Sequence, residues 1–197
     1  MVYTLAKYNG TPIRHGKYGY NQNSFVRIAV RETKQFDDFM DCISILPKIN
    51  KISHIHINID SDIIVGFMWL ESESLLKHEE YIESRCNLLV NYIETIDTGK
   101  CIPAIIICSR TFLIIDGHHR FGALKKLGLK KMPCLLINYS HPNIIVNPYN
   151  KSISKEQVLN ASKNNLPPKS TCHHLIDNNT NTHPIQVLSP IVQITQN

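Results

Sequence analysis

From residue 61 onward, apolar side chains occur in two patterns, and each pattern predicts one kind of element. Continuous apolar runs predict four short strands, at residues 63–70, 102–108, 111–115 and 132–139. Apolar residues at helical spacing predict two helices, over residues 79–96 and 119–127. Gly128 ends the second helix, since glycine adopts the left-handed conformation at a helix C-terminus. The combination predicts an α/β or α+β fold, with a small mixed sheet flanked by helices.

The two ends of the chain carry weaker patterns. Before residue 61, apolar residues predict a strand at 25–30, a short helix at 36–46 and a strand at 54–59. Near the other end, Ser154 and Gln157 form a capping box for a helix that reaches about residue 164. The composition of residues 177–184 predicts a linker, and residues 185–194 alternate weakly like an edge strand or a tail.

These patterns predict four parts. They are an N-terminal segment of unknown role packed on the core (1–60), a central domain (61–140), a C-terminal helical segment (141–176), and a linker with a tail (177–197).

Composition places the chain among ordinary globular proteins. With 197 residues, 43% of them hydrophobic and 19% charged, it can bury a normal core without disulfides or metals. The net charge of +5 suits an anionic small molecule such as a nucleotide and falls short of the concentrated charge of a DNA-binding domain. Six scattered cysteines without a C-x-x-C pair favour reduced thiols over a zinc site.

The sequence also bears on location. The first residues reach Gly10 and Pro12 without an apolar signal core, and no run approaches the roughly 18 apolar residues of a membrane span. We therefore expect a cytoplasmic protein without a membrane partner. The absence of acidic residues before Glu32 leaves organelle targeting open.

The clearest chemical motif is Asp116-Gly117-His118-His119-Arg120, where an apolar strand stops and a helix begins. A helix N-terminus presents unpaired amides, Gly117 allows close approach, and the next three side chains add donors and charge. This arrangement suits a phosphate group. The alternative is a structural corner in which Asp116 only caps the helix. Adjacent helical side chains point about 100° apart, so we do not expect the two histidines to share a metal ion.

Two further motifs flank it. Lys77-His78-Glu79-Glu80 places carboxylates at the start of the first predicted helix, where the helix dipole alone also favours them. Residues 166–174 combine a diproline with Lys169, hydroxyls and histidines, a composition that by itself is more typical of a polar linker than of a site. The sequence lacks the P-loop, dinucleotide-binding and protein-kinase motifs.

Together, in this order, the three motifs resemble the ParB/sulfiredoxin superfamily, and most closely its free serine kinases. The superfamily likeness covers residues 63–139, and the segment from Pro167 to His173 extends it toward the free serine kinases. The resemblance implies a ParB/sulfiredoxin-like domain. It also implies transfer of a phosphoryl group from ADP or ATP, with Mg²⁺, to the hydroxyl of free L-serine, yielding O-phospho-L-serine.

The resemblance also assigns roles to residues. Glu79 corresponds to the catalytic carboxylate that takes the hydroxyl proton, and Asp116 is the second catalytic carboxylate. The remaining assignments are phosphate or nucleotide contacts, at Gly117, His118, His119 and Arg120, and contacts to the amino acid, at Lys169, Ser170, Thr171 and His173. No set of metal ligands is predicted. Phosphoryl transfer needs mostly positioning and charge neutralisation, with one base near the nucleophile, and these residue types suit it.

The chain departs from this family in one respect, and other functions must be weighed. The family usually carries an aromatic residue, often Trp, shortly after the strand at 135–139; here the one Trp is Trp69, and Tyr149 is the nearest candidate. Sulfiredoxin chemistry needs a cysteine where His118 stands. A ParB-like DNA-associated protein needs a helix-turn-helix module after Tyr139, where the sequence offers one short helix. A non-catalytic nucleotide sensor is the main alternative, because every feature except the role of Glu79 serves binding as well.

Overall fold

The computed structural model describes residues 13–15, 26–28, 57–95, 101–147 and 153–194. Contacts divide the chain into two compact units, Met1–Ile57 and Asn58–Asn197. In the first unit, β1 (Ile13–His15) and β2 (Val26–Ile28) pair antiparallel, and β2 falls within the strand predicted at 25–30. The helix predicted at 36–46 lies outside the described residues. Of the strand predicted at 54–59, only residues 57–59 are described, and they form no strand.

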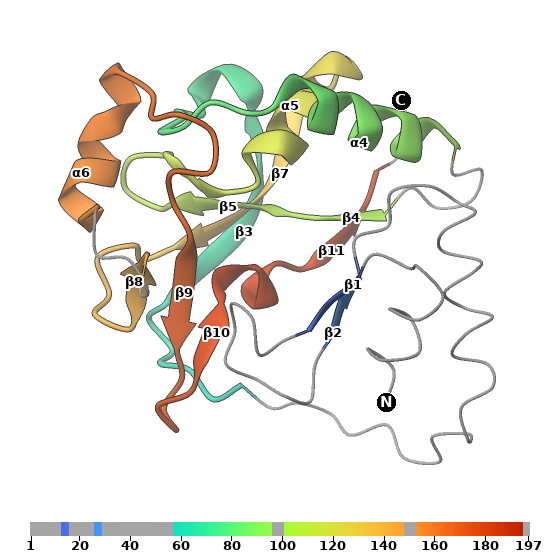
Figure 1. Ribbon diagram of the computed structural model, residues 1–197. Helices are drawn as coiled ribbons and strands as arrows, with labels where there is room; N and C mark the ends of the chain where they lie inside the picture. Colours follow the sequence, from blue (N-terminus) through green and yellow to red (C-terminus); the bar gives the residue numbers. More distant parts are fainter. Residues whose placement is uncertain (1–12, 16–25, 29–56, 96–100, 148–152, 195–197) are drawn as a thin grey trace, which may run out of the picture. The chain divides into compact units, whose positions relative to one another are not determined.

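The second unit is built on a four-stranded mixed sheet with the order β3-β7-β5-β6 (Figure 1). Its strands are β3 (Ile64–Glu71), β5 (Ile105–Cys108), β6 (Ile114–Asp116) and β7 (Lys131–Ile137). β5 runs parallel to β7, and the other two pairings are antiparallel. All of β5, and all of β7 after Lys131, is buried, as continuous apolar runs predict for strands covered on both faces. The expected mixed α/β architecture with small sheets is confirmed.

Two helices lie side by side next to this sheet, α4 (Glu83–Thr95) and α5 (His118–Lys126) (Figure 1). α5 turns Phe121, Ala123 and Leu124 into the core, as its spacing predicts, and Gly128 follows it with φ 78°. α4 corrects the sequence-based expectation, because it begins at Glu83 rather than at Glu79. The preceding residues pair instead as extended chain, Leu76 with Leu113 and Glu79 with Leu166. These long-range backbone bonds override the local helical pattern.

The packing of α4 on α5 depends on Gly122. A Cβ atom at this position would lie 2.9 Å from Sγ of Cys86, which is fully buried. We expect Gly122→Ala to lower the free energy of unfolding by about 1 kcal/mol, because overpacking of about 1–3 kcal/mol outweighs the gain of about 1 kcal/mol in helix propensity. Urea denaturation measures the change. The control is Lys125→Ala on the same helix, where an exposed ion pair with Glu73 is lost at little cost. An unchanged or raised stability in Gly122→Ala would contradict close helix packing.

The remaining segments form two smaller sheets and one helix. β4 (Cys101–Pro103) pairs with β11 (Ile191–Gln193), while β10 (Thr182–Pro184), β9 (His173–Ile176) and β8 (Ile144–Val146) form an antiparallel sheet in that order. The strand predicted at 102–108 is therefore divided between two sheets. The linker expected at 177–184 is wrong in part, because it contains the whole of β10. Of residues 166–174, the last two already belong to β9.

The C-terminal helix α6 (Lys155–Asn160) starts with the predicted capping box. Gln157 N–H donates to Ser154 Oγ, and Ser154 N–H donates to Gln157 Oε1. Three short 3₁₀ helices complete the described elements, η1 (Ser72–Ser74), η2 (Ala161–Lys163) and η3 (Ile185–Leu188). None of the helices in the described part of the chain is long and apolar enough to cross a bilayer.

Candidate active site

The three motifs that the sequence singled out meet at one buried place. The segment around Glu79 runs beside both β6 and the segment that follows α6, since Leu76 N–H donates to Phe112 O and Leu166 N–H donates to His78 O. Side chains 78 and 79 therefore lie between Ile114 on one side and residues 169–171 on the other. The extended conformation, which the helical pattern did not predict, is what brings the motifs together.

Glu79 is a buried carboxylate held by backbone amides. Glu79 is only 6% exposed. Oε1 accepts from the Lys169 N–H at 3.3 Å, and Oε2 accepts from the Thr171 hydroxyl at 3.0 Å and from the Thr171 N–H at 3.1 Å. None of the ion pairs among the described residues involves Glu79, and burial raises the pKa of this carboxyl despite these hydrogen bonds. A carboxylate in such a place is a better proton acceptor than one in water.

His78 was missed by the sequence analysis, which considered only the carboxylates of its motif. Its imidazole is fully buried, with Nδ1 2.6 Å from Ile114 O and Nε2 2.8 Å from Thr171 Oγ1. Burial lowers the pKa of His78 to about 4, so the ring is neutral at neutral pH. The signal that could have found it is its position next to Glu79 in a four-residue run of charged and titratable side chains.

His118 and His119, the first two residues of α5 after Gly117, have different surroundings. His118 is buried beside His78, with ring centroids 4.5 Å apart, and its Nε2 has no hydrogen-bond partner among the described residues. His119 is half-buried, and its Nε2 accepts from the N–H of Ile82 at 3.1 Å. Burial lowers the pKa of His119, and the charges of Arg85 and Lys169 lower it further. A buried orphan acceptor or donor and a nearby positive field are features of a site that takes an anion.

His173 completes the buried group. Its ring centroid lies 5.7 Å from that of His78, and its Nε2 is 2.9 Å from the hydroxyl oxygen of Tyr139. Burial lowers the pKa of His173 well below its usual value. Three buried imidazoles from three distant segments therefore lie together, with the ring of His78 against those of His118 and His173.

Arg120 is not placed with these groups. Its guanidinium donates to the carbonyl oxygens of Pro103 at 2.9 Å and Ala104 at 2.7 Å, and it pairs with Oδ2 of Asp116. The other oxygen of Asp116 accepts from Nε2 of Gln186 at 2.9 Å. Gly117 has φ 103°, and a Cβ there would lie 3.0 Å from the guanidinium. Asp116 and Arg120 thus tie β6 and α5 to β4 and η3.

The segment before β9 forms a turn whose amides face Glu79. Lys169 adopts φ 64°, and Ser170 Oγ donates to Pro167 O at 2.6 Å. The sequence analysis missed Asn147, whose side chain fixes this turn by donating to Ser170 O at 2.9 Å and accepting from the Cys172 N–H at 2.6 Å. Nothing in the local sequence around Asn147 indicates this role.

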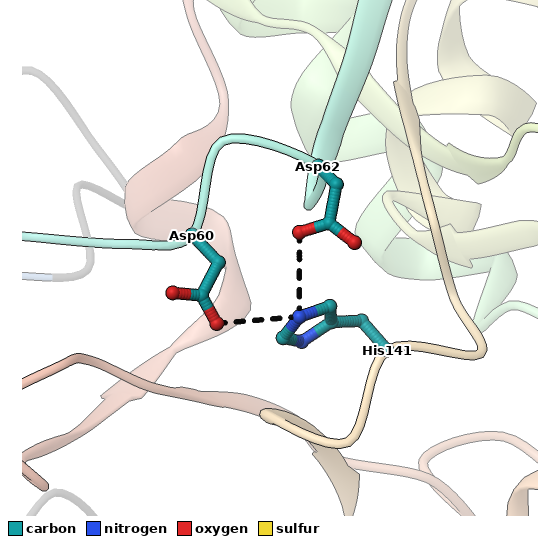
Figure 2. Close-up of side chains that lie close together, drawn as sticks. All are labelled: Asp60, Asp62 and His141. Atoms are coloured by element: carbon teal, nitrogen blue, oxygen red, sulfur yellow. Dashed lines mark ion pairs between the residues drawn. The ribbon is translucent and has the colours of Figure 1, made fainter.

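One other cluster among the described residues has the composition of a metal site, Asp60, Asp62 and His141 (Figure 2). His141 Nε2 lies 3.3 Å from Asp60 Oδ2 and 3.4 Å from Asp62 Oδ1. The Asn143 N–H donates to His141 Nδ1 at 3.1 Å, so the neutral ring carries its hydrogen on Nε2 and directs it at the carboxylates. A metal ion would need a lone pair at that atom. The cluster is therefore explained by polar contacts within the protein.

Comparison with known proteins finds partial sequence relatives. The chain is 34% identical over 73 residues to an ATP-dependent L-serine kinase of Desulfurococcus mucosus, covering 36% of this chain and 28% of that protein. It is 32% identical over 91 residues to a ParB-like protein of Sulfolobus acidocaldarius, covering 46% and 44%. An ADP-dependent L-serine kinase of Thermococcus kodakarensis is 25% identical over 87 residues, covering 42% and 35%. No protein-family model matches the chain.

Among solved structures, a free serine kinase in complex with AMP aligns with a TM-score of 0.37 and 22% identity, covering 49% of this chain and 39% of that one. The chain thus spans less than half the length of these relatives. It is a distant homologue of ParB-like proteins. Within that group, its homologues include the ATP- and ADP-dependent free serine kinases.

Proposed function

We propose that this protein is a ParB/sulfiredoxin-like phosphotransferase that moves a phosphoryl group from ATP or ADP to the hydroxyl of free L-serine. The observation that carries the proposal is Glu79, a buried carboxylate without an ion-pair partner among the described residues, at the meeting point of all three motifs. Burying a carboxylate without a counter-charge lowers the stability of the fold. A role as proton acceptor in a catalytic site accounts for such a residue.

In the proposed reaction, Glu79 takes the proton of the serine hydroxyl. The serine oxygen then bonds to phosphorus while the bond between phosphorus and the bridging oxygen of the nucleotide breaks, releasing ADP or AMP. The N-terminus of α5 supplies amides to the phosphate, with His118 and His119 beside it. Gly117 allows close approach of the backbone.

The amino acid would lie against the turn at Lys169, Ser170 and Thr171, with His173 behind it. The charges of Lys169 and Arg85 suit a carboxylate or a phosphate there, as their effect on His119 indicates. In this proposal, residues 61–140 bind the nucleotide and residues 141–176 bind the amino acid.

Mg²⁺ accompanies the nucleotide in this proposal. Mg²⁺ prefers carboxylate, water and phosphate oxygens, and Asp116 is the carboxylate directly before Gly117 and the N-terminus of α5. Both oxygens of Asp116 already accept hydrogen bonds, one from Arg120 and one from Gln186, so Mg²⁺ would be held chiefly by the phosphates. The ion would neutralise phosphate charge during transfer.

Incubation of the purified protein with Mg²⁺, L-serine and either ATP or ADP tests the proposal. We expect O-phospho-L-serine, detected by mass spectrometry, with one or both donors. Reactions without serine, and with L-alanine in its place, are the controls, because alanine lacks the acceptor hydroxyl. Nucleotide binding without formation of any phosphoamino acid from serine or its hydroxyl analogues would favour a non-catalytic nucleotide sensor.

A further inference from the structure

Strand β3 forms one edge of the main sheet and exposes apolar side chains along it. Its neighbour in the sheet is β7, so the other side of its backbone has no strand partner among the described residues. Of the ten large apolar side chains that the described part of the chain exposes, five lie on this strand, namely Ile64, Val65, Phe67, Met68 and Trp69. Contiguous apolar surface of this kind marks an interaction site.

This edge lacks the features that normally prevent an exposed strand from pairing. Such edges are commonly protected by lysine or proline, by short length or by a bulge. β3 is the longest strand of the described part of the chain. From Gly66 to Glu71 it pairs regularly with β7, contains no lysine or proline, and carries one charge, at its last residue. The irregularity in its pairing lies between Ile64 and Gly66, at one end only. Another extended strand can therefore add to this edge.

The hydrogen bonds to β7 decide which residues of β3 face the open edge. The Ser72 N–H donates to the carbonyl oxygen of Lys130, just before β7. In an antiparallel pair, residues that bond to the neighbouring strand alternate with residues that face away from it. The even-numbered residues of the regular segment therefore bond toward β7. Phe67, Trp69 and Glu71 turn their N–H and C=O groups to the open edge.

We propose that this edge is a docking surface for a second copy of the chain, which adds its own β3 antiparallel and joins the two sheets into one. The two-fold axis passes by Met68, so Met68 lies opposite its counterpart and Phe67 lies opposite Trp69 of the second copy. Phe67 and Trp69 then exchange backbone hydrogen bonds and form a cross-strand aromatic pair on each side of the axis. An isologous contact of this kind needs a surface that is complementary to itself.

The neighbouring registers are less favourable. Only a shift by two residues keeps the edge-facing groups of both copies opposite one another. A shift in one direction would place the Glu71 carboxylate opposite the Phe67 ring and shorten the overlap. A shift in the other direction would place Trp69 opposite Val65, within the irregular end of the strand. The register centred on Met68 avoids both.

Charge also favours a second copy as the occupant. Antiparallel pairing brings the N-terminal end of each β3 beside the C-terminal end of the other. The chain before the strand carries the acidic residues Asp60 and Asp62, whereas the exposed Lys130 and Lys131 border its end. Lys131 pairs with Glu71 at 3.7 Å, and Lys130 has no ion-pair partner among the described residues. Opposite charges therefore meet at both ends of the contact.

Sedimentation equilibrium of the full chain over a series of concentrations tests the contact. We expect a monomer and dimer in equilibrium, and Phe67→Lys should weaken the dimer at least about 30-fold, the effect of losing one central interface residue. The control is Val187→Lys on η3, since Val187 and Phe67 are both 44% exposed, and it should leave the dimer unchanged. Circular dichroism checks the fold of both variants. A chain that is monomeric at every concentration, with the edge left to another segment or another protein, overturns the proposal, as does equal weakening in the two variants.

A second measurement tests the register and does not depend on whether Phe67→Lys folds. In the proposed register the two Met68 residues form a non-hydrogen-bonded pair with Cα atoms about 4.5 Å apart, a separation that a disulfide can span. Met68→Cys should therefore give a covalent dimer under mild oxidation, above the level that the wild-type cysteines give.

Gly66→Cys is the matched control on the same strand. An added Cβ at Gly66 meets nothing within 4 Å, so the substitution is tolerated. The two copies of residue 66 would lie about 14 Å apart along the paired strands, too far for a disulfide. Equal cross-linking of the two variants, or none from Met68→Cys, overturns the proposed pairing. None of the residues assigned to the candidate active site lies on β3, so these results are independent of phosphoserine formation.

Discussion

Glu79→Gln should lower the rate of phosphoserine formation by at least about 100-fold while leaving the protein folded and able to bind nucleotide. General-base assistance contributes roughly 10²- to 10⁴-fold, and an amide cannot take the hydroxyl proton. Glutamine has nearly the same shape, and its carbonyl oxygen can still accept the Lys169 or Thr171 N–H. The measurement is initial phosphoserine production by mass spectrometry, with circular dichroism and nucleotide titration on the same sample.

The control for this experiment is the neighbouring carboxylate. Glu80 is exposed. Its carboxylate forms an ion pair with Lys77 at 3.0 Å and accepts a hydrogen bond from the side chain of Asn165 at 2.6 Å, so it is engaged at the surface. Glu80→Gln should retain activity within a few-fold, since exposed pairs contribute little. Equal losses in the two variants, or full activity in Glu79→Gln, would contradict the role of Glu79 as the base.

Arg120→Ala should lower the free energy of unfolding by about 3 kcal/mol. Removing one partner of a buried pair leaves Asp116 without its counter-charge, and the carbonyl oxygens of Pro103 and Ala104 each lose one donor, although Ala104 keeps the Ser189 hydroxyl. The side chain of Arg120 is only 14% exposed, so solvent replaces these contacts poorly. Urea denaturation measures the change.

Nucleotide affinity of the same variant distinguishes the structural role from the phosphate-binding role that the sequence predicts. If the guanidinium held phosphate, Arg120→Ala would remain nearly as stable as the wild type and lose roughly 10- to 150-fold in affinity, the value of a charge-assisted contact of about 1.5–3 kcal/mol. Arg120→Lys is the matched control. It keeps the charge but not the planar fork, and it should recover only part of the stability.

Much of the fold could be predicted from local pattern. The continuous apolar runs of β5, β6 and β7 and the helical spacing of α5 reflect burial, whereas the apolar run of β3 forms a strand that is mostly exposed. The glycines at 117 and 128 mark the two ends of α5 because both adopt positive φ. The capping box at Ser154 is also local, since its two hydrogen bonds span three residues.

The sequence could also predict which motifs carry the chemistry, because carboxylates, imidazoles and hydroxyls are concentrated in three short segments. It could not predict what each side chain contacts. Glu79 leaves the helical pattern because Leu166, almost ninety residues away, pairs with it as extended chain. Arg120 turns to the carbonyls of Pro103 and Ala104, which lie where β4 leaves one sheet and β5 enters another.

The sequence by itself therefore determined the main strands, the helix after Gly117 and the residue types at the candidate site, whereas the tertiary structure decided the start of α4, the smaller sheets and what each site residue contacts. A buried strand or helix is specified by the apolar pattern of its own residues. The partner of a polar group depends on which distant donors and acceptors remain unsatisfied after the chain has folded. His78 shows the difference most clearly, since its Nδ1 lies 2.6 Å from a carbonyl oxygen 36 positions away and its Nε2 lies 2.8 Å from a hydroxyl oxygen 93 positions away.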